Sequence, residues 1–132
     1  MTHPLPLVWR MIPGKYYLLG THCANCSTDY FPERQICPKC RRHSKLSAKK
    51  MPDKGKIYSF TEVHAAPTGF EYEAPYFLAI VELDNGVKLL SQIVDTPENK
   101  IVVGAPVEMR FRRVGEDDHE NVLAYGYKFA AV

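Results

Sequence analysis

The stretch HCANCSTDYFPERQICPKCRR, residues 22–42, contains all four cysteines of the 132-residue chain. They form two C-x-x-C pairs separated by ten residues: Cys23 and Cys26, then Cys37 and Cys40. Each pair can place two thiolates on one tight turn, and two such turns joined by a short hairpin can present four sulfurs tetrahedrally to Zn²⁺. We therefore predict a structural zinc site with four protein ligands, which leaves no coordination position for a substrate.

Other uses of the four cysteines fit the sequence less well. Disulfides need an oxidising compartment, and a thioredoxin-like redox pair needs only one C-x-x-C. An iron centre of the rubredoxin kind uses the same four thiolates and stays the main alternative to zinc. Either metal would organise a module that is too small to form a hydrophobic core of its own.

The N-terminal stretch PLPLVWRMIP, residues 4–13, is apolar but short, and Arg10 and the prolines interrupt it. It has neither the basic beginning nor the small-residue cleavage site of a secretory signal, and no apolar run in the chain is long enough to cross a bilayer. Hydrophobic residues make up 45% of the sequence, enough for a globular core. We expect a soluble, cytoplasmic protein.

Positive charge is concentrated between Arg34 and Lys56, where nine basic residues accompany a single acid, Asp53. Because the whole chain carries only +2, the remainder is acidic. A local positive field suits a phosphate-bearing ligand, a nucleic acid or an acidic protein surface. A solvated face that partly neutralises the thiolates would have the same composition.

After the cysteines the hydrophobic period changes from irregular to alternating, which is typical of β-strands. Strands are predicted over residues 55–64, 76–84, 87–94, 106–114 and 122–129, with a hairpin at Asn85–Gly86 and an acidic turn at 115–121. In the first of these strands Ile57 is expected to share a face with Thr61 and Val63, and in the fourth Phe111 is expected to point inward. Residues 7–20 predict a short helix, punctuated by Pro13 and Gly14, and then a strand.

These elements give a mainly β fold class with two domains. Residues 1–46 are expected to form a short helical segment and a rubredoxin-like zinc ribbon, and residues 47–132 a C-terminal OB-fold barrel. No nucleophile elbow, phosphate-binding loop or dinucleotide fingerprint is present in the sequence, and the predicted metal site occupies every cysteine. An enzyme is therefore disfavoured.

The segment AAPTGFEYEAPYF, residues 65–77, is an apolar and aromatic loop between the first two predicted barrel strands. A loop at the mouth of a barrel is a natural ligand or partner site. The alternative is that its aromatic side chains cap the barrel core, which fits Tyr76 best because that residue begins a strand.

Six blocks, taken in order, resemble one known family: VWRMIPGKYYLLG, CANC, FPERQICPKC, GKIYSFTEV, APYFLAIVELDNG and VVGAPVEMRF. The chain resembles, over nearly its full length, the small acyl-CoA-associated proteins in which a rubredoxin-like zinc ribbon precedes an OB-fold. Gly14 and Lys15 depart from the pattern, since many relatives have an acid and an arginine there.

The resemblance is greatest to the stand-alone archaeal form, and it implies a partnership with enzymes. It implies a non-catalytic subunit that bridges acetoacetyl-CoA thiolase and hydroxymethylglutaryl-CoA synthase in the mevalonate route to isoprenoid lipids. Such a subunit would help to bind CoA while the acetoacetyl group passes between the two active sites. Retention of the product of an unfavourable condensation beside the next enzyme raises its effective concentration there.

We assign candidate CoA contacts as a hypothesis that rests on the loop composition. Aromatic side chains would line a groove for the adenine or the pantetheine arm: Phe70, Tyr72, Tyr76, Tyr58 and Phe60. Cations would face the phosphates: Lys49, Lys50, Lys54, Arg110, Arg112 and Arg113. Two alternatives stay open. An OB barrel with aromatic and basic residues can bind single-stranded nucleic acid, and a pure scaffold would join the enzymes without touching CoA.

Overall fold

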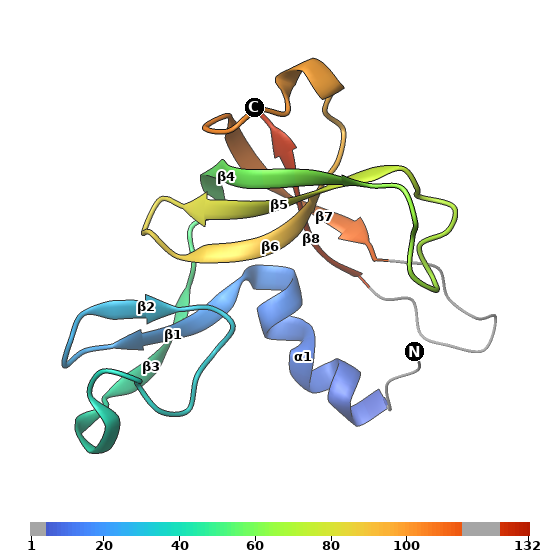
Figure 1. Cartoon of the computed structure of the whole chain (residues 1–132). Helices are drawn as coiled ribbons and strands as arrows, with labels where there is room; N and C mark the ends of the chain where they lie inside the picture. Colours follow the sequence, from blue (N-terminus) through green and yellow to red (C-terminus); the bar gives the residue numbers. More distant parts are fainter. Residues whose placement is uncertain (1–4, 115–124) are drawn as a thin grey trace.

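The computed structural model describes residues 5–114 and 125–132 and contains one helix, a three-stranded sheet and a closed barrel (Figure 1). The three-stranded sheet, called here the ribbon sheet, has the order β2-β1-β3 and contains β1 (Leu19–Cys23), β2 (Thr28–Tyr30) and β3 (Leu46–Lys50). The barrel contains β4 (Lys54–Val63), β5 (Tyr76–Leu83), β6 (Lys88–Ile93), β7 (Pro106–Arg113) and β8 (Tyr125–Ala131). In the described part of the chain, no helix has the length and apolar character needed to cross a membrane.

The barrel strands are joined in the order β4-β5-β6-β8-β7, and β7 closes the barrel on β4. This is the Greek-key arrangement of an OB-fold, so the predicted fold class is confirmed. The predicted hairpin between β5 and β6 is also confirmed. Gly86 donates its N–H to the Leu83 carbonyl at 2.8 Å and has a φ of +87°, so a type I turn ends on a left-handed glycine.

The strand β3 lies across the predicted domain boundary and pairs with β1 from Leu46 to Lys50. Only three residues, Met51–Asp53, then separate the ribbon sheet from the first barrel strand. The division into domains at residues 46 and 47 stays a prediction. The acidic turn predicted at 115–121 lies outside the described residues.

Helix α1 (Leu5–Tyr17) is longer than predicted, because it continues through Pro13 and Gly14 to Tyr17. Proline removes one backbone hydrogen bond from a helix interior, but packing supports the last turn. The ring of Tyr16 lies edge-on to Phe111 of β7, with 4.9 Å between the ring centroids. The C-terminal end of the helix thus packs on the barrel, while its N-terminal half extends away from it (Figure 1).

Residues that flank the ribbon sheet contribute to the barrel core. Leu18, at the end of α1, is fully buried and has a left-handed backbone with a φ of +52°. Its carbonyl accepts a hydrogen bond of 2.9 Å from the N–H of Met51, which is also buried. Both side chains belong to the same hydrophobic cluster as Ile57 and Phe129. The segments before and after the ribbon sheet therefore help to fill the barrel.

One predicted strand face and one predicted core position are wrong. In β4 an irregularity between Ile57 and Ser59 inserts one extra residue, so Ile57 lies opposite Val81 on the inner face whereas Thr61 lies opposite Leu78 on the outer face. In β7, Phe111 is 51% exposed instead of buried. Its ring stacks on Tyr125 of β8, with 5.4 Å between the ring centroids. Phe111 therefore packs against Tyr125 and against Tyr16 of α1 and not in the barrel core.

Candidate metal centre and ligand groove

The four cysteines lie together at the end of the ribbon sheet that is remote from the barrel. Their sulfur atoms all lie within 4.8 Å of one another. The Sγ atoms of Cys23 and Cys40 are 3.8 Å apart, and those of Cys26 and Cys37 are 3.5 Å apart. Zn–S bonds of about 2.3 Å in a tetrahedron place sulfurs about 3.8 Å apart, whereas a disulfide needs about 2.05 Å. The arrangement fits a tetrahedral four-thiolate metal site.

Two tight turns position these ligands. Ser27 and Arg41 follow the second cysteine of each pair, where glycine is common, and their φ angles are +55° and +48°. A left-handed backbone costs a non-glycine residue free energy. Both turns are therefore slightly strained, and metal binding is well able to offset that cost.

Hydrogen bonding prepares two thiols for metal binding. A backbone hydrogen bond from Lys45 is the main cause that lowers the pKa of the Cys23 thiol. Burial alone would raise the pKa of the Cys37 thiol, but hydrogen bonds from the Tyr30 hydroxyl and from the backbone N–H groups of Cys40 and Lys39 lower it to about 6. The Tyr30 hydroxyl lies 3.3 Å from Cys37 Sγ, and this hydrogen bond is the main reason that its own pKa rises to about 12. The sequence held no local signal for Tyr30, because the contact depends on the fold of the second turn.

Exposed cations surround the metal site. A hollow of about 590 Å³ beside Cys40 is lined by Asn25, Lys39, Arg42, His43 and Lys45. A zinc ion with four thiolates carries a net charge of about −2. These cations therefore reduce the local negative charge, which accounts for part of the basic segment without any further ligand.

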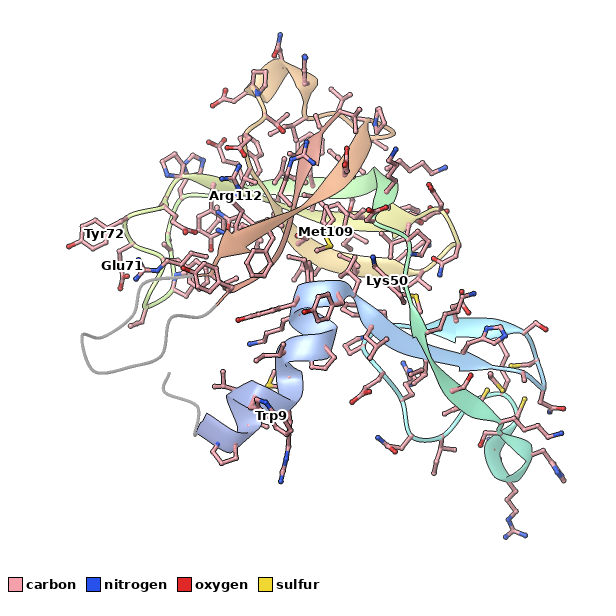
Figure 2. All side chains as sticks on the ribbon, turned by 180° about the vertical axis from the view of Figure 1, so that it is seen from behind. Trp9, Lys50, Glu71, Tyr72, Met109 and Arg112 are labelled. Atoms are coloured by element: carbon pink, nitrogen blue, oxygen red, sulfur yellow. The ribbon has the colours of Figure 1, made fainter. Side chains whose placement is uncertain are left out.

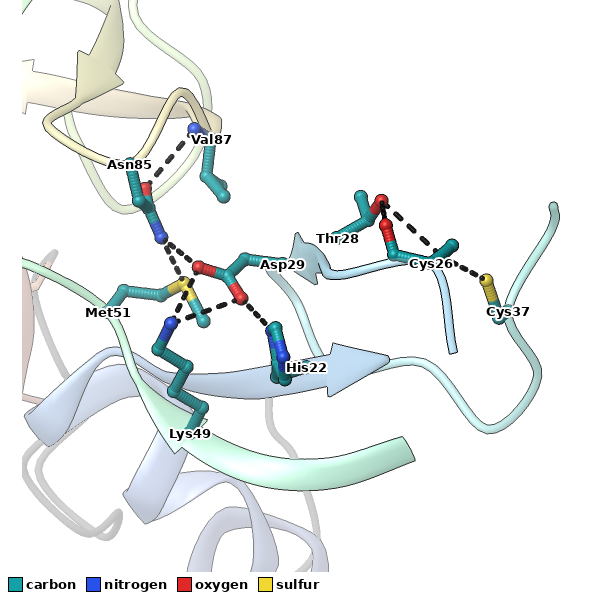
Figure 3. Close-up of polar contacts among 9 residues, drawn as sticks. All are labelled: His22, Cys26, Thr28, Asp29, Cys37, Lys49, Met51, Asn85 and Val87. Atoms are coloured by element: carbon teal, nitrogen blue, oxygen red, sulfur yellow. Dashed lines mark hydrogen bonds and ion pairs between the residues drawn. The ribbon is translucent and has the colours of Figure 1, made fainter. Parts of the chain in front are cut away.

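A second polar cluster joins the ribbon sheet to the barrel (Figure 3). At its centre is Asp29 of β2, whose carboxylate lies 2.5 Å from His22 Nδ1 and 3.1 Å from Lys49 Nζ. Asn85, in the β5–β6 turn, donates a hydrogen bond of 2.8 Å to the same carboxylate. Burial opposes ionisation of Asp29, but these three hydrogen bonds lower its pKa.

A groove of about 380 Å³ lies between the last turn of α1, the loop 64–75 and the outer face of β5, β6 and β8. It is called here the α1 groove. Its apolar lining comes from Phe70, Tyr76, Leu78, Leu90 and Tyr127. Burial raises the pKa of the Tyr127 hydroxyl. An apolar groove of this size that also contains a few polar groups is typical of small-molecule sites.

Only two of the predicted aromatic contacts lie together in the α1 groove: Phe70 and Tyr76, whose ring centroids are 6.1 Å apart. Tyr72 points away from the barrel and is 83% exposed (Figure 2). Tyr58 lies under the Lys88 ammonium at 4.0 Å, and Phe60 packs on Phe77.

The predicted cations are also dispersed. Lys49 pairs with Asp29, and Arg110 pairs with Glu108 at 3.3 Å. Arg112 pairs with Asp95 across the barrel end. Lys49 and Lys50 border a shallow hollow of about 280 Å³ near Asn85, Lys54 begins β4 and Arg113 ends β7. Three of the cations that we assigned to phosphate binding, Lys49, Arg110 and Arg112, thus already form ion pairs with carboxylates of the protein.

Two known family models match the two parts of the structure separately. The family model described as "ChsH2, rubredoxin-like zinc ribbon domain" matches residues 13–45, and "ChsH2, C-terminal OB-fold domain" matches residues 48–112. A DUF35 domain-containing scaffold protein of Methanocaldococcus jannaschii is 47% identical over 124 residues, which cover 94% of this chain and 88% of the relative. The chain belongs to the DUF35 scaffold protein family.

Two further comparisons agree with this assignment. A DUF35 domain-containing scaffold protein of Methanothermobacter thermautotrophicus is 45% identical over 92% of this chain and 91% of its own length. The solved structure named "Ltp2-ChsH2(DUF35) aldolase" contains a chain that is 26% identical, with a TM-score of 0.71 over 99% of this DUF35 protein and 96% of that chain. The predicted resemblance is therefore confirmed at the level of the family and its two-part fold.

Sequence reasoning missed Lys128 as a residue of the α1 groove. Lys128 is only 5% exposed although it lies on the outer face of the barrel. Its position within the pattern YGYKF gives no sign of burial, since lysine in an alternating strand normally faces solvent. The loop 64–75 covers it, and a strand pattern carries no information about a covering loop.

Proposed function

We propose that this DUF35 protein is a non-catalytic subunit that bridges acetoacetyl-CoA thiolase and hydroxymethylglutaryl-CoA synthase. In this role it helps to bind CoA and supports transfer of acetoacetyl-CoA in the cytoplasmic mevalonate pathway. Its relatives are named scaffold proteins, and its solved neighbour is named together with an aldolase. A metal with four cysteine ligands has no open position for catalysis, which fits a structural role.

The observation that carries the proposal is the exposed apolar surface of α1. Trp9 is 73% exposed and projects from the half of the helix that extends away from the barrel (Figure 2). Leu7 and Met11 are also exposed, but on another side of the same helix because they stand two positions from Trp9, and Tyr17 is exposed at the end of the helix. Tryptophan and tyrosine are among the residue types that contribute most to protein–protein binding, and the half of α1 that extends from the barrel leaves Trp9 accessible to a partner.

A second apolar patch supports a bridge rather than a single contact. Val102, Val103 and Val132 are all more than half exposed and lie at the end of the barrel that is remote from α1 (Figure 1). Val132 is joined to that end by a hydrogen bond of 3.2 Å from its N–H to the Pro106 carbonyl. Two apolar patches at opposite ends of a small protein allow two enzymes to bind at once.

Co-elution of the purified full-length protein with both enzymes tests the proposal. We expect a ternary complex on size-exclusion chromatography after nuclease treatment. Trp9→Glu should lose one enzyme, and Val103→Glu should lose the other, because each variant places a charge in one apolar patch. As a matched control, Lys88→Glu changes an exposed charge at the start of β6, which belongs to neither patch, and should retain the complex.

Two results would count against this function. If the wild-type protein elutes alone in the presence of both enzymes, there is no bridge. Recovery of single-stranded nucleic acid from cells without nuclease, with binding that falls steeply as salt rises, would favour the nucleic-acid alternative instead.

A further inference from the structure

The polar lining of the α1 groove is unusual because it contains a buried lysine. The Lys128 side chain is 6% exposed, and its Nζ atom lies 3.4 Å from Glu73 Oε1 on the covering loop. The second oxygen of Glu73 accepts a hydrogen bond of 3.1 Å from Gln92 Nε2. The charge of the ammonium is therefore balanced, and the loop is fixed to β6 and β8 by one carboxylate.

This pairing leaves hydrogen-bonding capacity in the groove. An ammonium group has three donors, and within the described residues Lys128 Nζ forms one hydrogen bond, to Glu73. A buried donor without a partner costs free energy. Because Glu73 already balances the charge, the group that best fits the remaining donors is a neutral carbonyl oxygen rather than a second anion.

A different lysine offers an uncompensated charge. Lys15, in the last turn of α1, also lines the groove and is only partly buried. Among the described residues no carboxylate pairs with it. An anionic group of a ligand would therefore bind at Lys15, and the apolar side chains of Leu78 and Leu90 would contact the connecting chain.

The shape of the groove decides between the two ends of CoA. The rings of Phe70 and Tyr76 are 6.1 Å apart and inclined at 39°. They pack against each other, so a flat base cannot be inserted between them. The groove has an apolar lining, the buried Lys128 on one strand and the partly buried Lys15 on the helix. This combination suits a flexible chain that contains amide or thioester carbonyls and ends in a phosphate.

We propose that the α1 groove binds the phosphopantetheine arm of an acyl carrier, with Lys128 and Gln92 facing its carbonyl and amide groups and Lys15 its phosphate. This inference rests on the proposed function, because it assigns CoA binding to the α1 groove and to the phosphopantetheine arm of CoA. The same arm is present in CoA and on acyl carrier proteins, so the chemistry alone fits both sources.

Titration of the zinc-loaded, full-length protein with 4′-phosphopantetheine tests the site. We expect saturable binding of this probe and of CoA, and binding of adenosine 3′,5′-bisphosphate, which lacks the arm, that is at least about tenfold weaker. A phosphopantetheine-loaded carrier protein distinguishes the two sources: if it binds more tightly than CoA, a carrier protein is the source, and if it does not, CoA is.

Three substitutions locate the binding. Lys15→Glu should weaken 4′-phosphopantetheine by about tenfold or more, since a charged hydrogen bond is replaced by repulsion. Leu90→Glu places a carboxylate at an exposed position of the groove and should weaken it similarly without a change in folding. Lys128→Met should also weaken the binding of 4′-phosphopantetheine. If loss of the Lys128–Glu73 pair unfolds the loop in that variant, the affinity of Leu90→Glu still tests the groove.

The matched controls lie on the same barrel outside the groove. Lys56→Glu and Tyr58→Ala should change the affinity for 4′-phosphopantetheine by less than about twofold. If CoA binds and only Tyr58→Ala weakens it, the groove assignment is overturned while CoA binding by the protein stands. If the wild-type protein binds none of the probes, the groove assignment is likewise overturned, and co-elution with the two enzymes then decides the bridging function independently.

Discussion

Asn85 of the barrel donates a hydrogen bond from Nδ2 to the Asp29 carboxylate of the ribbon sheet, at 2.8 Å and across 56 positions of sequence. The same Asn85 amide lies 3.2 Å from the sulfur of Met51, the buried residue that connects the two parts. Because Asp29 also binds His22 and Lys49, one carboxylate holds both sides of the junction. The orientation of the metal site relative to the barrel therefore depends on this contact.

The substitution Asn85→Asp should destabilise the junction. It keeps the acceptor that binds the Val87 N–H in the turn, but it replaces a donor by a carboxylate that faces Asp29. We expect the free energy of unfolding to fall by about 1–2 kcal/mol in urea denaturation, because a hydrogen bond to a charged group is lost and like charges are brought together.

The reciprocal variant provides the control for this prediction. In Asp29→Asn combined with Asn85→Asp, donor and acceptor are exchanged, so part of the lost stability should return. A double variant that is as unstable as the sum of the two single variants would show that the contact across the junction does not contribute to stability.

Metal analysis should give one zinc ion per chain, and Cys37→Ser should abolish tight binding. Cys37 is buried and the pKa of its thiol is lowered to about 6, so its loss removes a ligand that is well prepared for the metal. Removal of zinc by a chelator should unfold the ribbon sheet, since the metal supplies on the order of 10 kcal/mol to such modules. A reddish protein with iron in place of zinc would contradict the choice of metal but not the ligand set.

The buried pair of Lys128 and Glu73 should be sensitive to the loss of one partner. In Glu73→Gln the ammonium of Lys128 stays buried without its counter-charge. Breaking such a pair is costly, but Glu73 is 29% exposed and water can partly replace it. We therefore expect a loss of about 1–3 kcal/mol in thermal or urea unfolding. The double variant Lys128→Met with Glu73→Gln should be more stable than Glu73→Gln alone, and a double variant of equal or lower stability would argue against the pair.

Two glycines of the N-terminal half should respond in opposite ways to alanine. At Gly20 of β1 a Cβ atom would lie 2.2 Å from the Tyr30 carbonyl oxygen, so Gly20→Ala must separate β1 from β2. We expect a loss of about 1–3 kcal/mol together with weaker zinc retention. At Gly14 of α1 the nearest atom is 3.9 Å away, and Gly14→Ala should stabilise the helix by about 0.5–1 kcal/mol. Equal effects at the two sites, measured by urea denaturation, would contradict the close approach in the ribbon sheet.

Local patterns in the sequence predicted the features that depend on neighbouring residues. The C-x-x-C spacing determines which atoms can meet around a metal, and Asn85–Gly86 determines a turn, so both were recognisable before the fold was known. The five barrel strands followed from alternation in the same way.

Features that depend on distant packing were not predictable in this way. One extra residue in β4 reversed the faces beyond Ile57, and no pattern distinguishes such an insertion from a regular strand. Phe111 was read as core because it alternates with arginines, but the aromatic rings of Tyr16 and Tyr125 cover it instead. The aromatic CoA contacts were grouped by composition, and only Phe70 and Tyr76 proved to share a groove.

Leu18 and Met51 have a consequence for how this family can be recombined. Both flank the ribbon sheet in sequence, yet both fill the interior of the barrel. An excised barrel that begins at Lys54 would contain a cavity where the Leu18 and Met51 side chains pack. A barrel grafted from a relative would instead be filled by two side chains that match a different core. Chimeras should therefore fold only when Leu18 and Met51 come from the same protein as the barrel that they fill. The ribbon sheet and the barrel are thus expected to be exchanged together and not separately.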